Sequence, residues 1–233
     1  MFLDFDGTLV PITGDPAAPR LSAGVTTVLK QLSSRASWVI TIISGRSICD
    51  LRERIGLEGL IYAGNHGLEI CGHGLQFVEP VAAAWRAALE RLADELALAV
   101  DPIPGTMVEY KGLTASVHYR QAAATDWPLI ERTVAAAAAR AGDAFSVQPG
   151  RKVFDIVPRT NWHKGAAVQW INSHLGNRDL TTIYLGDDAS DENAFAVLPD
   201  AITIKIGTAG LTAARYRVPD PAAVHDFLYR LAQ

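Results

Sequence analysis

The hydrophobic pattern of the chain changes near residue 80 and again near residue 158, so a central segment differs from the two segments that flank it. In residues 1–79 and 159–233, short apolar runs typical of buried strands alternate with amphipathic stretches typical of helices. This order predicts a parallel sheet with helices on its faces. The predicted strands are 2–3, 38–43, 60–63, 181–185 and 202–206, and the predicted helices contain Val25 to Leu32 behind a Ser22 N-cap, Ile48 to Ile55, Val168 to Leu175, Phe195, and Val224 to Leu231.

Residues 80–158 show a different order, helix-strand-strand-helix-strand-strand. Their first helix is expected to carry Val81, Trp85, Leu89, Leu92 and Leu96 on one face. We therefore predict an α/β protein with a Rossmann-like parallel-sheet core, residues 1–79 and 159–233, and an inserted α+β domain, residues 80–158. The strands predicted in the insert are 107–111, 114–119, 144–148 and 152–157, and its second helix carries Trp127, Ile130 and Val134.

Composition narrows the class of protein. The chain has 233 residues, of which 49% are hydrophobic and 20% charged, and this balance is that of a folded globular protein rather than a disordered one. Its net charge of -4 argues against nucleic acid or an anionic membrane as a partner. Cys49 and Cys71 have neither disulfide-like nor zinc-like spacing, and no apolar run is long enough to span a membrane. We expect a monomer in the cytoplasm.

Two groups of acids follow predicted strands. Asp4-Phe5-Asp6-Gly7-Thr8 comes after the first strand, and Gly186-Asp187-Asp188-Ala189-Ser190-Asp191-Glu192 comes after the strand 181–185. Open α/β sheets bind ligands at the carboxyl ends of their strands. Neighbouring carboxylates repel unless a cation is present, and hard oxygen ligands suit Mg²⁺. Instead of binding a metal, the second group of acids could simply begin a helix, with Ser190 as N-cap and Asp191 and Glu192 in the first turn. We expect this helix-start role for Glu192.

A candidate anion site lies between these acids in the sequence. Ser44-Gly45-Arg46 follows the predicted strand 38–43, and Lys164 stands near the start of the next core helix. A serine hydroxyl, free amides at a helix start and a lysine ammonium together suit a phosphate group. Each of these residues alone would be explained as an ordinary N-cap or surface residue. Their combination with the two groups of acids favours a phosphoryl-transfer site.

These four motifs resemble those of the haloacid dehalogenase superfamily, and the insert resembles its second type of cap. The resemblance implies that Asp4 attacks phosphorus and that Asp6 protonates the leaving alcohol and then activates water. It implies that Ser44 and Lys164 hold the phosphoryl oxygens. The implied Mg²⁺ ligands are Asp4, the backbone carbonyl of Asp6, and Asp187, with Asp188 or Asp191 in support.

A narrower resemblance comes from five segments. They resemble, in the same order, segments of trehalose-6-phosphate phosphatases. These segments are Gly64 to Glu69, Glu109 to Gly112, His118 to Arg120, Pro149 to Val153 and Asp188 to Glu192. That family implies a sugar-phosphate substrate, a pathway link to trehalose-6-phosphate synthase, and sugar contacts from Glu109, Lys111 and Asp155. Asp155 stands where glutamate is usual, so its reach to the sugar is expected to need a changed backbone or a water. The remaining expected substrate contacts are Gly45, Arg46, Asn65 and His66. A purely structural role is an alternative for His66, His118 and Arg120.

Other functions explain less of the sequence. A cap-bearing phosphatase of sucrose phosphate or mannosyl-3-phosphoglycerate is the nearest alternative, and a phosphoryl-transfer mutase is a more distant one. A phospho-accepting signalling domain would leave Asp6 and the insert without a role. A sugar-binding protein without catalysis would be expected to have lost Asp4 or Asp6, and both are present.

Overall fold

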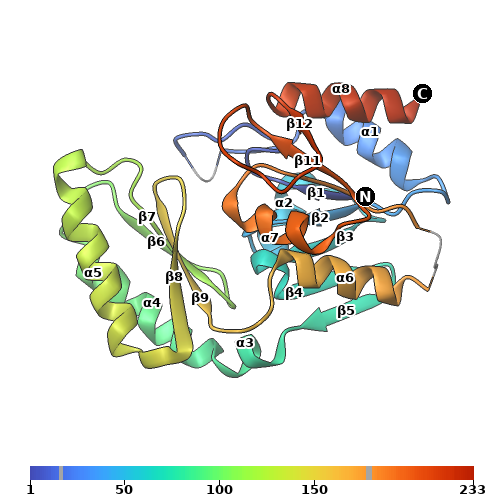
Figure 1. Ribbon diagram of the computed structural model, residues 1–233. Coiled ribbons are helices and arrows are strands. Elements are labelled where there is room, and N and C mark those ends of the chain that lie inside the picture. The colour runs from blue at the N-terminus through green and yellow to red at the C-terminus, as the bar shows by residue number, and fades with distance from the viewer. Residues whose placement is uncertain (16–17, 177–179) are drawn as a thin grey trace. The chain divides into compact units, whose positions relative to one another are not determined.

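The computed structural model describes residues 1–15, 18–176 and 180–233 and divides them into two compact units (Figure 1). One unit combines Met1–Phe77 with Trp162–Gln233, and the other is Val78–Asn161. The predicted α/β architecture, a Rossmann-like parallel-sheet core with an inserted α+β domain, is confirmed. No helix in the described part of the chain is long and apolar enough to cross a membrane.

The first unit is built on a sheet of eight strands in the order β12-β11-β10-β1-β2-β3-β4-β5. The strands from β12 to β3 are parallel, and β4 runs antiparallel to β3. The chain leaves β1 towards β2 and later returns to β10 on the other side of β1, so the order reverses between β1 and β10. Ligands bind at such switch points in open α/β sheets. The strands are β1 (Phe2–Asp4), β2 (Thr41–Ile43), β3 (Ile61–Gly64), β4 (Glu69–Gly72), β5 (Leu75–Val78), β10 (Ile183–Gly186), β11 (Ile202–Ile206) and β12 (Tyr216–Val218).

Helices cover both faces of this sheet, as Figure 1 shows. Alternate residues of each strand reach opposite faces: Leu3 packs with one core and Phe2 with the other. The first core contains α1 (Ala23–Ser33), α2 (Ile48–Ile55) and α8 (Pro221–Ala232), and the second contains α6 (Lys164–His174) and α7 (Ala189–Val197). The sheet is therefore buried on both faces, which explains the continuous apolar runs of its strands.

The core helices α1 and α7 begin with side-chain caps, and the cap of α7 differs from the predicted one. Ser22 caps α1 as predicted. Ser190 does not cap α7; the N-cap is Asp188, whose carboxylate accepts hydrogen bonds from the amides of Ser190 and Asp191. The side chain of Asp191 in turn accepts from the amide of Asp188, so the two aspartates form a reciprocal capping box.

The second unit is a four-stranded antiparallel sheet with two long helices. Its strands lie in the order β6-β7-β9-β8, and all four strands predicted in the insert are present. Leu89, Leu92 and Leu96 are buried, but Val81 and Trp85 are exposed because the predicted helix breaks at Trp85. The elements are α3 (Pro80–Ala84), α4 (Arg86–Val100), β6 (Met107–Tyr110), β7 (Ala115–His118), α5 (Trp127–Arg140), β8 (Phe145–Pro149) and β9 (Val153–Pro158).

Candidate active site at the switch point of the sheet

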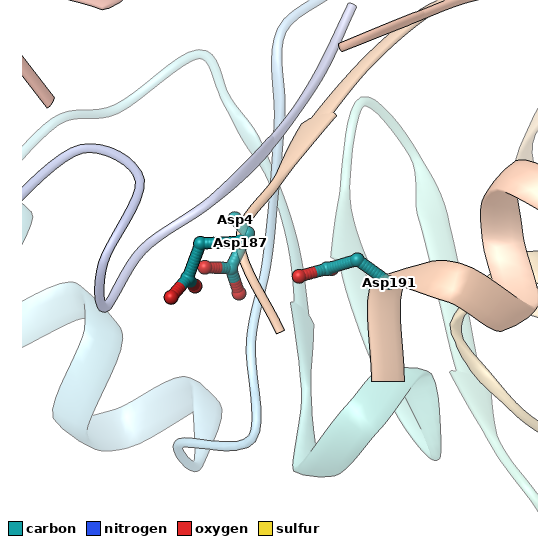
Figure 2. A group of neighbouring side chains, drawn as sticks. All are labelled: Asp4, Asp187 and Asp191. Carbon is teal, nitrogen blue, oxygen red and sulfur yellow. The ribbon is translucent and has the colours of Figure 1, made fainter. Parts of the chain in front are cut away.

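Three buried aspartates meet where the strand order reverses. Asp4 is the last residue of β1, Asp187 follows the neighbouring strand β10, and Asp191 stands in the first turn of α7. Each offers a carboxylate oxygen, and these oxygens lie within 4.8 Å of one another. Figure 2 shows Asp191 reaching from α7 towards the other two side chains. The three acids are thus brought together by two adjacent parallel strands and the helix that follows one of them, although Asp4 and Asp191 are 187 positions apart in the sequence.

Two glycines make room for these carboxylates. Gly7 has a positive φ of 87°, and a β-carbon there would overlap the carboxylate of Asp187. A β-carbon on Gly186 would overlap the side chain of Asp191. Glycine is therefore required at both positions by the close approach of an acid.

Lys164 joins two of the acids. Its ammonium donates to Oδ1 of Asp4 and to Oδ1 of Asp191, both at 2.8 Å, and the side chain is almost completely buried. Burial by itself would lower the pKa of Lys164, but Asp191 and Asp4 outweigh burial and raise that pKa. The ammonium therefore stays charged and fixes the orientation of Asp4.

The donor set fits Mg²⁺. Oδ2 of Asp4 is buried, and no residue in the described part of the chain forms a hydrogen bond with it. Burial raises the pKa of Asp4, and although Lys164 opposes the rise, the charges of Asp191 and Asp187 add to it. A divalent cation among three buried carboxylates would offset this repulsion and use the remaining lone pairs, and hard oxygen ligands suit Mg²⁺.

Asp188, predicted as a metal ligand, is engaged elsewhere. Its Oδ1 accepts from the amide of Ser190 at 2.8 Å and from the hydroxyl of Ser190 at 2.7 Å. The structure thus places Asp191, rather than Asp188, in the cluster with Asp4 and Asp187.

Arg46 contacts Asp6. Its Nε and Nη2 donate to the two carboxylate oxygens of Asp6, at 2.5 and 2.7 Å. Its Nη1 donates to Asp50 at 2.9 Å, and Asp50 also accepts from Arg54 at 2.7 Å. Arg46 was predicted as a substrate contact, and in this structure it orients the expected acid/base.

The other predicted phosphate and substrate residues of the core lie in two turns. Ser44 is buried directly after β2, and its hydroxyl accepts from the amide of Arg46 at 3.2 Å. The ring of His66 lies close to Gly45, where a β-carbon would overlap it. Asn65 is buried, and its amide donates to Glu69 at 2.7 Å, so its described contact is structural.

The three predicted sugar residues form one group within the second unit. Nζ of Lys111 lies 3.9 Å from Oε2 of Glu109 and 3.7 Å from Oδ1 of Asp155. Glu109 belongs to β6 and Asp155 to β9, with β7 between them. The sheet order therefore gathers residues that are 46 positions apart.

Two residues that contact side chains of the candidate site were not predicted from the sequence. Tyr184 is buried in β10, and its hydroxyl donates to Oδ1 of Asp191 at 2.7 Å; strand alternation alone does not reveal this contact. Asp50 has a clearer sequence signal, because Arg46, Asp50 and Arg54 are spaced four residues apart.

A doubly wound sheet with a buried lysine and a carboxylate cluster at its switch point is the fold and site arrangement expected from the resemblance to the haloacid dehalogenase superfamily. The fold agrees with that of a haloacid dehalogenase-like hydrolase from Bacteroides thetaiotaomicron, with a TM-score of 0.66, 16% identity, and coverage of 99% of this chain and 98% of that one. Within this class the family is also defined: residues 2–221 match the family model described as trehalose-phosphatase, and the chain belongs to that family.

Individual relatives support the family assignment. Trehalose-phosphate phosphatases of Mycobacterium ulcerans and Mycobacterium tuberculosis are 39% and 38% identical to this chain over all of its length. The chain spans 61% of the length of these relatives. A crystal structure of a trehalose-6-phosphate phosphatase related protein superposes with a TM-score of 0.87 at 27% identity, covering 99% of this chain and 96% of that chain.

Proposed function

We propose that this chain hydrolyses trehalose 6-phosphate to trehalose and phosphate, with Mg²⁺ as cofactor and an aspartyl phosphate on Asp4 as intermediate. The observation that carries the proposal is the environment of Asp4. Lys164 holds Oδ1 of Asp4, and Oδ2 makes no hydrogen bond within the described residues. The anchored oxygen keeps a second lone pair for Mg²⁺, and the other oxygen is left to attack phosphorus.

Mg²⁺ would be held by Asp4, Asp187 and the backbone carbonyl of Asp6, with Asp191 adding negative charge nearby. When bound, it would neutralise the carboxylates and draw the phosphate dianion into an otherwise acidic site. Lys164 and Ser44 are proposed to hold the phosphoryl oxygens, and Arg46 to contact substrate as well as Asp6. We assign a support role to Asp191 because Lys164, Tyr184 and the amide of Asp188 already use its oxygens.

Each half of the reaction needs one proton transfer. In the first, Asp4 forms a bond to phosphorus while the ester P–O bond breaks, and Asp6 gives a proton to the departing sugar oxygen. In the second, Asp6 takes a proton from water, whose oxygen bonds to phosphorus and releases Asp4. The paired nitrogens of Arg46 orient the ionised carboxylate of Asp6, which is the form that takes the proton from water in the second step.

The second unit, proposed as residues 80–158 of a specificity cap, would read the sugar. Glu109, Lys111 and Asp155 supply acceptors and donors for hydroxyl groups, and Gly45, Asn65 and His66 are proposed to border the substrate on the core. A hydroxyl-rich disaccharide suits this mixture of charges better than an apolar substrate does.

The activity is tested by phosphate release from trehalose 6-phosphate, glucose 6-phosphate, sucrose 6-phosphate and p-nitrophenyl phosphate. We expect trehalose 6-phosphate to have the highest kcat/KM. Glu109→Ala and Lys111→Ala should each lower that value by about one to two orders of magnitude while changing p-nitrophenyl phosphate cleavage little. Equal cleavage of glucose 6-phosphate and trehalose 6-phosphate by the unmodified chain would refute the trehalose assignment.

The nucleophile is tested separately. Asp4→Asn should abolish labelling of the protein by substrate carrying radioactive phosphate, and Asp6→Asn should slow turnover by roughly 10²- to 10⁴-fold with the fold intact. Label found on a residue other than Asp4 would overturn the mechanism.

A further inference from the structure

A row of polar residues crosses the sheet of the second unit. Glu109 stands opposite Ser116, Ser116 opposite Asp155, and Asp155 opposite Gln148. Directly opposed residues point to the same face of a sheet. The row therefore spans all four strands on one face.

The other face of this sheet forms the core of the unit. Val117, Phe154 and Ile156 are buried there and pack with residues of α4 and α5. Packing of the unit depends on that apolar face, so the polar row is not needed to fill the core. The polar row is therefore left for contact with water or with a polar ligand.

One cation, the ammonium of Lys111, lies near two acids of the row, Glu109 and Asp155. Nζ of Lys111 lies 3.7 Å from Asp155 and 3.9 Å from Glu109, longer than the roughly 2.7 to 2.9 Å of a charge-assisted hydrogen bond. The ammonium thus offsets the repulsion between the two acids without closing a tight ion pair with either.

Strand β7 holds both acids from the other side. The hydroxyl of Ser116 donates to Oδ1 of Asp155, and Nε2 of His118 lies 2.9 Å from Oε2 of Glu109. Ser116 and His118 are two residues apart on one strand, so they share the face of the row. In the described part of the chain, both side-chain contacts of Asp155 use Oδ1, which leaves Oδ2 as an acceptor for a ligand.

We propose that Ser116 and His118 are positioning residues of a polyol subsite on this face. Ser116 fixes the short side chain of Asp155, His118 fixes Glu109, and the resulting acceptor–cation–acceptor set binds vicinal hydroxyls of the sugar ring farther from the phosphate. The inference rests on the proposed sugar-phosphate substrate and deepens it. Its physical basis is preorganisation: anchored carboxylates lose less freedom on binding than mobile ones do.

The test compares variants that remove an anchor with variants that keep it. Ser116→Ala removes the hydroxyl, and Ser146→Ala is the matched control, since Ser146 lies on the neighbouring part of the same sheet, opposite Val157 rather than an acid. His118→Leu removes the second anchor, whereas His118→Gln keeps a donor near the position of Nε2. For each variant, kcat/KM is measured with trehalose 6-phosphate and with p-nitrophenyl phosphate, together with the melting temperature.

We expect Ser116→Ala and His118→Leu to lower the ratio of the two kcat/KM values by about tenfold. Ser146→Ala should leave the ratio unchanged, and His118→Gln should restore most of it. A loss of stability alone would lower both kcat/KM values together, so an unchanged ratio in Ser116→Ala and His118→Leu would overturn the inference.

Failure of the proposed substrate gives a different result. If the unmodified chain does not prefer trehalose 6-phosphate, the proposed function fails, and the same ratio is taken with the sugar phosphate that it does prefer. The positioning roles of Ser116 and His118 then stand or fall on that ratio.

Discussion

Arg46 holds both carboxylate oxygens of Asp6, through Nε at 2.5 Å and Nη2 at 2.7 Å. The planar guanidinium matches a carboxylate in a way that a lysine ammonium cannot. Arg46 is itself held by Asp50, which also accepts from Arg54. The orientation of Asp6 is thus set from α2.

The first prediction follows from this contact. Arg46→Lys and Arg46→Ala should lower kcat by about 10²-fold, because Asp6 loses its fixed orientation and substrate loses a proposed contact. Circular dichroism should show an unchanged fold. Arg52→Lys is the control, since Arg52 lies on α2 near Asp50 and its Nη2 donates to Cys71 instead. Wild-type turnover by Arg46→Lys would contradict the bidentate requirement.

The second prediction concerns the metal. Excess chelator should abolish turnover, and Mg²⁺ should restore it, because the cluster of Asp4, Asp187 and Asp191 would otherwise repel a phosphate dianion. Asp187→Asn should raise the Mg²⁺ concentration needed for half-maximal activity. Full activity in chelator, or recovery with zinc but not magnesium, would be incompatible with this site.

The third prediction tests support of the cluster by Tyr184. Tyr184→Phe removes the hydroxyl that donates to Asp191 and should weaken Mg²⁺ binding by about tenfold, measured as the Mg²⁺-induced rise in melting temperature. Tyr62→Phe is the matched control, because Tyr62 is buried in the same sheet but donates to the carbonyl of Leu57. The same Mg²⁺ affinity in both variants would show that Tyr184 only packs.

The fourth prediction concerns the buried charge of Lys164. Lys164→Met should lower the free energy of unfolding by about 3 to 5 kcal/mol in the absence of Mg²⁺, because Asp4 and Asp191 lose their shared counter-charge. Urea denaturation measures this change. Added Mg²⁺ should recover part of the loss; a variant as stable as the unmodified chain without Mg²⁺ would mean that the acids are already neutral.

The fifth prediction is a pH dependence. Burial would raise the pKa of Asp50, but hydrogen bonds from Arg54 and Arg46 outweigh it and lower that pKa below its usual 3.8. A lowered pKa in the folded state stabilises the protein above the unfolded-state value, and this contribution is lost as the pH falls through the folded-state value. Asp50→Asn should therefore be less stable than the unmodified chain near neutral pH, and the difference should shrink below about pH 4.

Urea denaturation across this pH range checks the prediction. Glu53→Gln serves as control, because Glu53 lies on the same helix but its pair with Arg20 is exposed and contributes little. A stability difference between Asp50→Asn and the unmodified chain that persisted at strongly acidic pH would exclude the ionised carboxylate as its source.

The hydrophobic pattern of the chain predicts short and edge strands least well. It did not predict β4, β5 or β12, which lie towards the edges of the sheet and have three or four residues each. The predicted strand 38–43 is regular only over Thr41–Ile43. Short strands have little periodicity of their own and depend on the partner that pairs with them.

The sequence by itself determined the order of helices and strands, the inserted α+β domain and the positions of the acidic motifs, because each of these depends on local periodicity or on contiguous residues. Tertiary structure decided which side chains meet. The reversal of strand order between β1 and β10 brings Asp187 to Asp4, and the first turn of α7 puts Asp191, rather than Asp188, in their cluster. The register of β7 with β9 sets Ser116 against Asp155. Such contacts depend on strand order and register, which bring together residues that are distant along the chain.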